Sequence, residues 1–174
     1  MLRRCAIVAA SPLVVAVLSS WPAAPATAAE ASGMSASVTG AGIVSTPDRS
    51  TATVPVTVRC DAFADQVSGH IDVTLVQTLG SKSSQGTGST NVVCDGAPHD
   101  YEVIVPTTDD ARWREAEATV SLSGEAEGYG EPQQVCIEGP DENGEIIVEC
   151  HEWSPHMIVH MTSDPAPIEL VTGP

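Results

Sequence analysis

Apolar and polar residues alternate along most of the chain, and this alternation is its clearest structural signal. In the most regular run, Val54, Val56, Val58 and Cys60 fall on one side, separated by a proline, a threonine and an arginine. Shorter runs with the same period occupy residues 34–39, 71–75, 101–105 and 116–123. A period of two is that of a β-strand with one face buried and the other in water. The pattern therefore predicts an all-β chain.

Residues that favour turns separate these runs. They include Thr46-Pro47-Asp48, the glycine- and serine-rich stretch 80–86, and Asp95-Gly96-Ala97-Pro98. Short strands divided by such turns are typical of an antiparallel β-sandwich, which we expect over about residues 34–126. Pro55 lies inside the most regular run and has no N–H to donate, so we expect it at a sheet edge or a bulge.

The first 29 residues have the layout of a secretory signal peptide. Two arginines precede a largely apolar stretch at 5–20, and Ala26-Thr27-Ala28 supplies the small residues of a cleavage site. A retained membrane anchor needs roughly 18 or more uninterrupted apolar residues, whereas Ser11 and Pro12 break this stretch. We therefore predict cleavage near residues 28–30, secretion, and no insertion of the mature chain in a membrane.

Loss of the signal peptide would leave four of the five cysteines, Cys60, Cys94, Cys136 and Cys150. An even number of cysteines in an exported domain predicts two disulfides, for which three pairings exist.

A predicted hairpin at 133–152 selects one of these pairings. Two strand-like segments flank the turn residues 139–144. If residues 142–144 form a three-residue loop with Gly144 in the left-handed conformation, then Asp141 pairs with Glu145 and Cys136 lies opposite Cys150. A two-residue Asn-Gly turn would miss this register by one. The prediction is therefore Cys136–Cys150, which leaves Cys60 for Cys94.

Beyond the hairpin, we predict a final strand at about 156–162 that adds to a sheet. The last residues, 164–174, contain prolines and are predicted to form a flexible tail. The mature domain thus spans residues 30–163, with the main sandwich first and the disulfide-linked hairpin after it.

The charge balance is strongly acidic. The chain has 7 Lys+Arg against 23 Asp+Glu, and removal of the two leader arginines would leave 5 against 23, a balance of −18. No Lys or Arg follows Arg114. Nucleic acids and anionic lipids are bound through clustered basic residues, so neither is expected as a partner. A protein or cell-surface ligand of the C-terminal hairpin is expected to be neutral or cationic.

The segment around Cys94 resembles a known group of proteins. Val92-Val93-Cys94-Asp95-Gly96 precedes Tyr101 and the apolar segment Val103-Ile104-Val105-Pro106. This order is similar to that of small secreted bacterial Ig-like β-sandwich proteins, which carry a Cys-Asp-Gly turn before an aromatic-bearing strand and have no assigned function. The resemblance covers about residues 34–126, and Tyr101 and Trp113 depart from the residues typical of the group. It implies an Ig-like fold and secretion, and no activity.

One late stretch contains the candidate metal ligands His151, His156, His160 and Met157. Imidazole and thioether groups are ligands that copper prefers. On one strand, however, His156 and His160 would stand about 13 Å apart at ~3.3 Å per residue, too far to share an ion directly. A copper-type site would require His151 to fold back towards them. We therefore predict no metal and no cofactor, and keep extracytoplasmic metal binding as the alternative function.

The sequence contains no recognisable catalytic motif. It has no Gly-x-Ser-x-Gly segment and no phosphate-binding loop, and its cysteines are expected to be oxidised. A small secreted hydrolase is the third hypothesis, because 23 carboxylates offer many possible pairs. The leading hypothesis is a non-catalytic module that binds a partner or a surface. Such a module needs an exposed apolar patch, for which Trp113 and Trp153 are the candidates.

Overall fold

The computed structural model describes residues 33–108, 111–140 and 142–173. Within these ranges the regular structure consists of eleven strands and no helix, which confirms the all-β prediction. The strands are β1 (Met34–Val38), β2 (Gly42–Val44), β3 (Thr51–Cys60), β4 (Asp65–Leu79), β5 (Lys82–Asn91), β6 (Pro98–Pro106), β7 (Glu117–Tyr129), β8 (Gln133–Pro140), β9 (Ile146–Trp153), β10 (His156–Thr162) and β11 (Ala166–Thr172). The predicted signal peptide, residues 1–29, lies outside the described residues.

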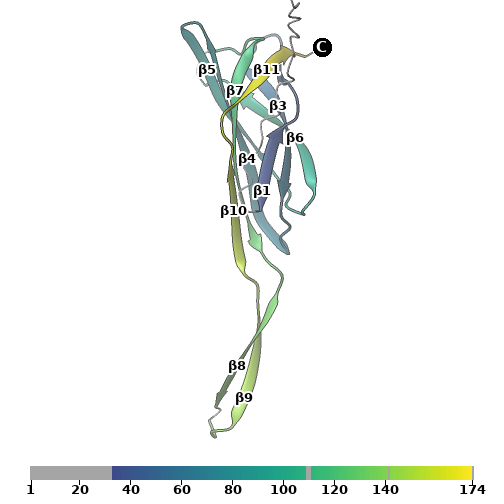
Figure 1. Ribbon diagram of the computed structural model, residues 1–174, viewed down its shortest axis with the longest axis vertical. Helices are drawn as coiled ribbons and strands as arrows, with labels where there is room; N and C mark the ends of the chain where they lie inside the picture. Colours follow the sequence, from purple (N-terminus) through teal and green to yellow (C-terminus); the bar gives the residue numbers. More distant parts are fainter. Residues whose placement is uncertain (1–32, 109–110, 141, 174) are drawn as a thin grey trace, which may run out of the picture.

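Nine strands form one hydrogen-bonded assembly, which we call the body. Its order is β1-β3-β2-β11-β7-β4-β5, with β6 paired to β3 and β10 paired to β7. All of these pairs are antiparallel except β2 with β11. The assembly folds back on itself so that β3 and β6 face β4 and β7 across one core (Figure 1). Strands β8 and β9 form a separate two-stranded sheet, the arm, which projects from one end of the body (Figure 1).

Alternation along the strands accounts for the core. In β3, Val54, Val56 and Val58 are at most 1% exposed, whereas the residues between them reach solvent in part. The same alternation runs along β7, whose Val120 and Leu122 face the same core. Burial of these aliphatic side chains is the main stabilising contribution to the body, at roughly 25 cal/mol per Å² of apolar surface removed from water.

Pro55 lies where one ladder of β3 is interrupted. Strand β6 pairs with β3 along one side, while β1 and β2 share the other side and leave a gap opposite Pro55. The Thr39 N–H donates to the Pro55 carbonyl across this gap, at 3.1 Å. The proline lacks an N–H at a position where the regular ladder is interrupted. This agrees with the expectation that Pro55 lies at an edge or a bulge of the sheet.

Two glycines of β5 allow the backbone of this strand to pack directly against the backbone of β6. A Cβ on Gly86 would lie 1.9 Å from the carbonyl oxygen of Pro106, and a Cβ on Gly88 would lie 2.1 Å from that of Ile104. No side chain can occupy that space without moving β5 away from β6. Glycine is required here by the approach of two backbones.

The first disulfide, Cys60–Cys94, joins the end of β3 to the loop before β6 and has a Cα–Cα distance of 4.7 Å. Gln66 supports that loop with two hydrogen bonds of 2.8 Å: its amide donates to the Val92 carbonyl and its oxygen accepts from the Cys94 N–H. The second disulfide is Cys136–Cys150. Both pairings are those that the hairpin register predicts.

The prediction of a flexible tail at residues 164–174 is wrong. Residues 166–172 form β11, which pairs with β7 and with β2. Ile168 and Leu170 are buried at 5% and 1% exposure, so they complete the core. Prolines at 165 and 167 do not prevent this, because a short strand at a junction between sheets tolerates missing donors. The body thus extends beyond the predicted sandwich and includes β10, whose predicted bounds are confirmed, and β11.

The arm continues the β7–β10 ribbon past an irregular joint. The body ladder ends at Tyr129 opposite His156, and the arm ladder begins at Gln133 opposite Trp153. Three residues therefore separate the ladders on one side and two on the other, as in a β-bulge. The Gly130 N–H donates to the Pro155 carbonyl at 2.9 Å within this joint.

Candidate functional site

Exposed apolar side chains are dense on the arm: its two strands hold six of the fifteen large apolar side chains that are exposed among the described residues. Residues of β8 and β9 pair in one regular antiparallel register from Gln133–Trp153 to Pro140–Ile146. Every residue in the two strands is exposed except the partly exposed Gly139. At the tip, between β8 and β9, Gly144 has a φ of 84°, a conformation that favours glycine. No body strand covers either face of this ribbon.

Side chains directly opposite one another in an antiparallel ladder share a face, so the register divides the arm into two faces. One face, which we call the apolar face, contains Val135, Ile137, Ile147 and Trp153. Their exposed fractions are 45%, 63%, 41% and 57%. These side chains would be buried in an ordinary sheet, because large aliphatic and aromatic groups favour contact with other apolar groups over water.

The opposite face of the arm carries the disulfide. Cys136 and Cys150 lie at its centre, directly opposite each other, and both are exposed. Glu152 flanks the bridge on the body side, and Glu138 and Val148 flank it on the tip side. The bridge thus fixes the register of the two strands without support from a core.

The charges of the arm are all of one sign apart from a histidine. Glu138, Glu142, Glu145, Glu149 and Glu152 belong to the arm or its turn, and no Lys or Arg lies between residues 133 and 153. His151 is 3.9 Å from a carboxylate oxygen of Glu149 on the apolar face. Glu149 thus shares the apolar face, while Glu138 and Glu152 lie on the opposite face and the other two glutamates lie in the turn.

The histidines that the sequence singled out do not come together. His156 Nε2 is 2.7 Å from Glu127 Oε1, and His160 Nδ1 is 3.1 Å from Glu125 Oε2 on the neighbouring β7. His151 lies on the arm instead. Over residues 33–108, 111–140 and 142–173, no group of three His, Cys, Asp or Glu side chains is close enough to hold an ion. The structure therefore does not bring His151, His156 and His160 together, and Met157 lies on β10 opposite Gly128 of β7.

The two tryptophans proposed as an interaction surface have opposite environments. Trp113 is fully buried, and its indole N–H donates to the Val105 carbonyl at 3.1 Å. Its assignment to a docking surface is wrong, because the loop before β7 folds this side chain under β6. Trp153 stays exposed at the base of the apolar face.

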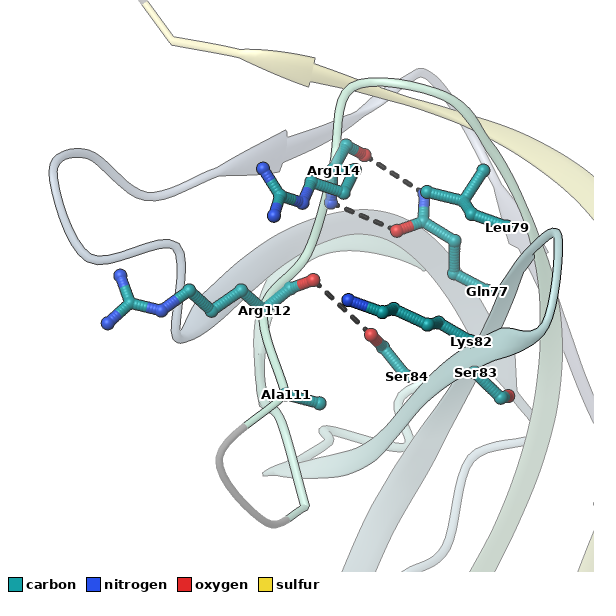
Figure 2. Close-up of a pocket in the computed structure, with 8 residues that line it drawn as sticks. All are labelled: Gln77, Leu79, Lys82, Ser83, Ser84, Ala111, Arg112 and Arg114. Carbon is teal, nitrogen blue, oxygen red and sulfur yellow. Dashed lines mark hydrogen bonds between the residues drawn. The ribbon is translucent and has the colours of Figure 1, made fainter.

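A cavity of about 450 Å³ lies at the end of the body far from the arm, between the β4–β5 turn and the segment before β7 (Figure 2). Gln77 is 2% exposed and holds this segment with two 2.9 Å bonds, donating to the Arg114 carbonyl and accepting from the Arg114 N–H. Figure 2 shows the guanidinium groups of Arg112 and Arg114 directed away from Gln77 and Lys82. The described residues that line the cavity include no carboxylate and no histidine, so they form no acid–base pair.

Two carboxyl groups have lowered pKa values, and both belong to turns. Hydrogen bonds from the Ser50 hydroxyl and backbone N–H lower the pKa of Asp48. The backbone N–H of Ala97, followed by His99, lowers the pKa of Asp95. Both carboxylates are exposed and stabilise the turns that contain them. Neither lies beside a nucleophile, and neither lines the cavity of Figure 2.

Comparison with protein-family models, with curated proteins and with solved structures finds no match. The described residues contain no helix of the length and apolarity needed to cross a bilayer. The Ig-like resemblance therefore stays a prediction, and the functional argument depends on the geometry of the arm.

Sequence reasoning identified the hairpin and Trp153 but missed the rest of the apolar face. The overlooked signal is the uninterrupted run Ile146-Ile147-Val148. A strand with polar residues on one face alternates, whereas three apolar residues in succession place apolar groups on both faces. A hairpin with such a run must cover it or offer it to another molecule.

Proposed function

We propose that this chain is a secreted, non-catalytic binding module in which an Ig-like β-sandwich body presents the arm to a protein partner. The arm docks through the apolar face. The partner offers an apolar surface flanked by Lys or Arg. The observation that carries the proposal is the joint exposure of Val135, Ile137, Ile147 and Trp153 on one face of an uncovered ribbon.

The apolar face supports docking because soluble domains rarely leave several large apolar groups together on a projecting element. A two-stranded hairpin is marginally stable in water without further packing. The Cys136–Cys150 bridge offsets this weakness by holding the strands in register before any partner arrives. A pre-ordered surface loses less conformational entropy on binding, so more of the contact energy is available as affinity.

The charge of the arm supports the choice of partner. The carboxylates of the arm attract Lys and Arg and repel polyanions and anionic membrane surfaces. They also repel a second copy of this acidic chain, whose charge balance without the two leader arginines is −18, from 5 Lys+Arg against 23 Asp+Glu. A protein with a basic rim around an apolar patch is therefore the favoured occupant.

Secretion and the Ig-like assignment of the body belong to the same proposal. Two disulfides indicate an oxidising, extracytoplasmic environment. The first 29 residues have signal-peptide composition, which supports export to the same environment. The sequence resemblance around the Cys-Asp-Gly turn at residues 94–96 supports an Ig-like body. Metal binding is less well supported, because His156 and His160 each pair with a glutamate of β7.

The test compares the oxidised protein with an Ile137→Ser, Ile147→Ser variant. A biotinylated, photo-crosslinkable form of each would be incubated with the exported and surface proteins of the producing organism. A protein captured by the unmodified arm would then be purified, and its affinity measured by calorimetry. The double variant is expected to bind at least about 10- to 30-fold more weakly, because truncated interface anchors cost roughly 1.4–2 kcal/mol or more.

Ile104→Ser is the matched control. Ile104 is 60% exposed on β6 of the body, against 63% for Ile137 on the arm. The control should retain full affinity. Equal loss in the control, or unchanged affinity in the arm variant, would refute docking through the apolar face. A purified partner whose binding surface is acidic would refute the charge argument.

A further inference from the structure

The two disulfides differ in their access to solvent. Cys60 and Cys94 are 0% and 4% exposed and belong to the core of the body. Cys136 and Cys150 are both exposed, in a ribbon whose opposite face also reaches water. Thiol–disulfide exchange requires a thiolate to reach a sulfur in line with the bond. The body bridge can be attacked only after the core opens, whereas the arm bridge can be attacked in the folded protein.

We propose that Cys136–Cys150 is a thiol–disulfide exchange site that reacts in the native state. A thiolate attacks Sγ of Cys136 or Cys150, forms a mixed disulfide with it, and releases the other cysteine as a thiolate. A second thiolate, from a second molecule of a monothiol or from the same dithiol, then attacks the reagent sulfur of the mixed disulfide and releases the attacked cysteine. Overall the arm disulfide is reduced to two thiols, and the two attacking thiols are oxidised to one disulfide.

The charges around the bridge select the thiol. Glu138 and Glu152 flank the bridge on its own face, and no Lys or Arg occurs in the arm. Carboxylates repel an approaching thiolate and attract a reagent that also carries an ammonium group. The preferred reactant is therefore a cationic or neutral thiol, or a protein thiol on a basic surface. An anionic thiol is disfavoured.

Exchange at this site would act on the arm and leave the body intact. The arm has no core, so its strands depend on the bridge for their register. The body keeps its own bridge between Cys60 and Cys94. The chemistry of the exchange does not depend on the proposed docking function. Its use as a means of releasing a docked partner does rest on that function.

The test treats the oxidised protein without residues 1–29, and so without Cys5, in native buffer with cysteamine, 2-mercaptoethanol or glutathione at matched thiolate concentration. Samples are quenched by alkylation, and each cysteine is followed by peptide mass mapping. Alkylation of Cys136 and Cys150 is expected to be faster than that of Cys60 and Cys94 by roughly tenfold or more, because only the body bridge needs an opening step. Cysteamine should reduce the arm bridge fastest, 2-mercaptoethanol more slowly, and glutathione slowest. Equal rates at the two bridges, or an arm bridge inert until the body unfolds, would overturn the proposal.

A charge-neutral variant tests the selection of the thiol. Glu138→Gln with Glu152→Gln removes the flanking charges and keeps the exposed bridge. The ratio of the reduction rate with cysteamine to that with glutathione should be smaller in this variant than in the parent protein. High salt should lower the same ratio in the parent protein. A difference that persists would refute the electrostatic part. These measurements use no partner, so failure of the docking proposal would leave their outcome unchanged.

Discussion

The body and the arm are built from the same kind of strand, yet they use it in opposite ways. In β3, Val54 and Val56 alternate with Pro55 and Thr57, and both valines are fully buried. In β8, Val135 and Ile137 alternate with Gln134 and Cys136, and both apolar side chains are exposed. Local sequence determines that each segment is extended. Whether its apolar residues stabilise the fold or remain available for binding depends on whether another sheet covers them.

This difference predicts that identical substitutions will have unequal effects in the two regions. Substitutions in the body should change the free energy of unfolding. Substitutions in the arm should change local order and binding instead.

The largest contrast is expected between the two tryptophans. Trp113→Ala removes a fully buried ring and its hydrogen bond to Val105. It should lower the free energy of unfolding by about 3–5 kcal/mol, because the substitution leaves a cavity and an unpaired carbonyl. Trp153→Ala, at an exposed position, should change it by less than about 0.5 kcal/mol. Urea unfolding followed by far-ultraviolet circular dichroism measures both, and similar losses would show that the arm packs on the body.

The next contrast is between the disulfides. Replacing Cys60 and Cys94 by Ser opens a loop with a sequence separation of 34. This variant should lose about 3–4 kcal/mol of stability on the loop-entropy model. Replacing Cys136 and Cys150 by Ser should leave unfolding of the body unchanged.

Hydrogen exchange measured by mass spectrometry separates these outcomes. In the arm variant, protection should fall only in peptides from 133–153, because the arm has no packing to replace the bridge. A fall in protection across β7 or β4 would mean that the arm and the body unfold together.

A smaller contrast is expected between two glycines in strands. Gly88→Ala would place a Cβ 2.1 Å from the Ile104 carbonyl oxygen, which is backbone and cannot rotate away. It should cost about 1–3 kcal/mol through displacement of β5 from β6. Gly139→Ala in β8 meets no atom within 4 Å and should be neutral. Thermal unfolding of the two variants provides the measurement, and an unchanged melting temperature for Gly88→Ala would contradict the close approach of β5 and β6.

The smallest expected effect concerns pH. The Ala97 N–H and His99 hold the pKa of Asp95 below its ordinary value in the folded protein. The unfolded chain therefore takes up the proton first as pH falls. The stabilising contribution is present above the unfolded pKa and is lost as pH falls through the folded pKa. Asp95→Asn should reduce stability slightly at neutral pH and converge with the parent in strong acid. The free energy of unfolding of the variant and of the parent would be measured from pH 2 to 7. A constant difference between the two over this range would contradict the prediction.

Much of the structure could be predicted from local patterns. Period-two alternation identified the strands that contain Val54 and Leu122, and the turn around Gly144 identified the register that places Cys136 opposite Cys150. These inferences succeeded because strand periodicity and hairpin register depend on neighbours a few residues apart.

Two expectations failed, and one alternative lost support, because they depend on distant parts of the chain. The tail became β11 because β2 and β7 provide partners for Ile168 and Leu170. Trp113 became buried because β6 lies over its loop. The histidines lie apart because the joint, residues 130–132 and 154–155, places His151 on the arm and leaves His156 and His160 on the body.

Sequence by itself determined the all-β character, the acidic surface and the hairpin with its disulfide, since these follow from composition and short-range spacing. Only the tertiary structure decided which apolar faces are covered. Val135 and Ile137 are as apolar as the valines of β3, but the core of the body forms from strands that are far apart in sequence. Among the described residues no such strand reaches the arm, and its apolar face therefore stays exposed to solvent.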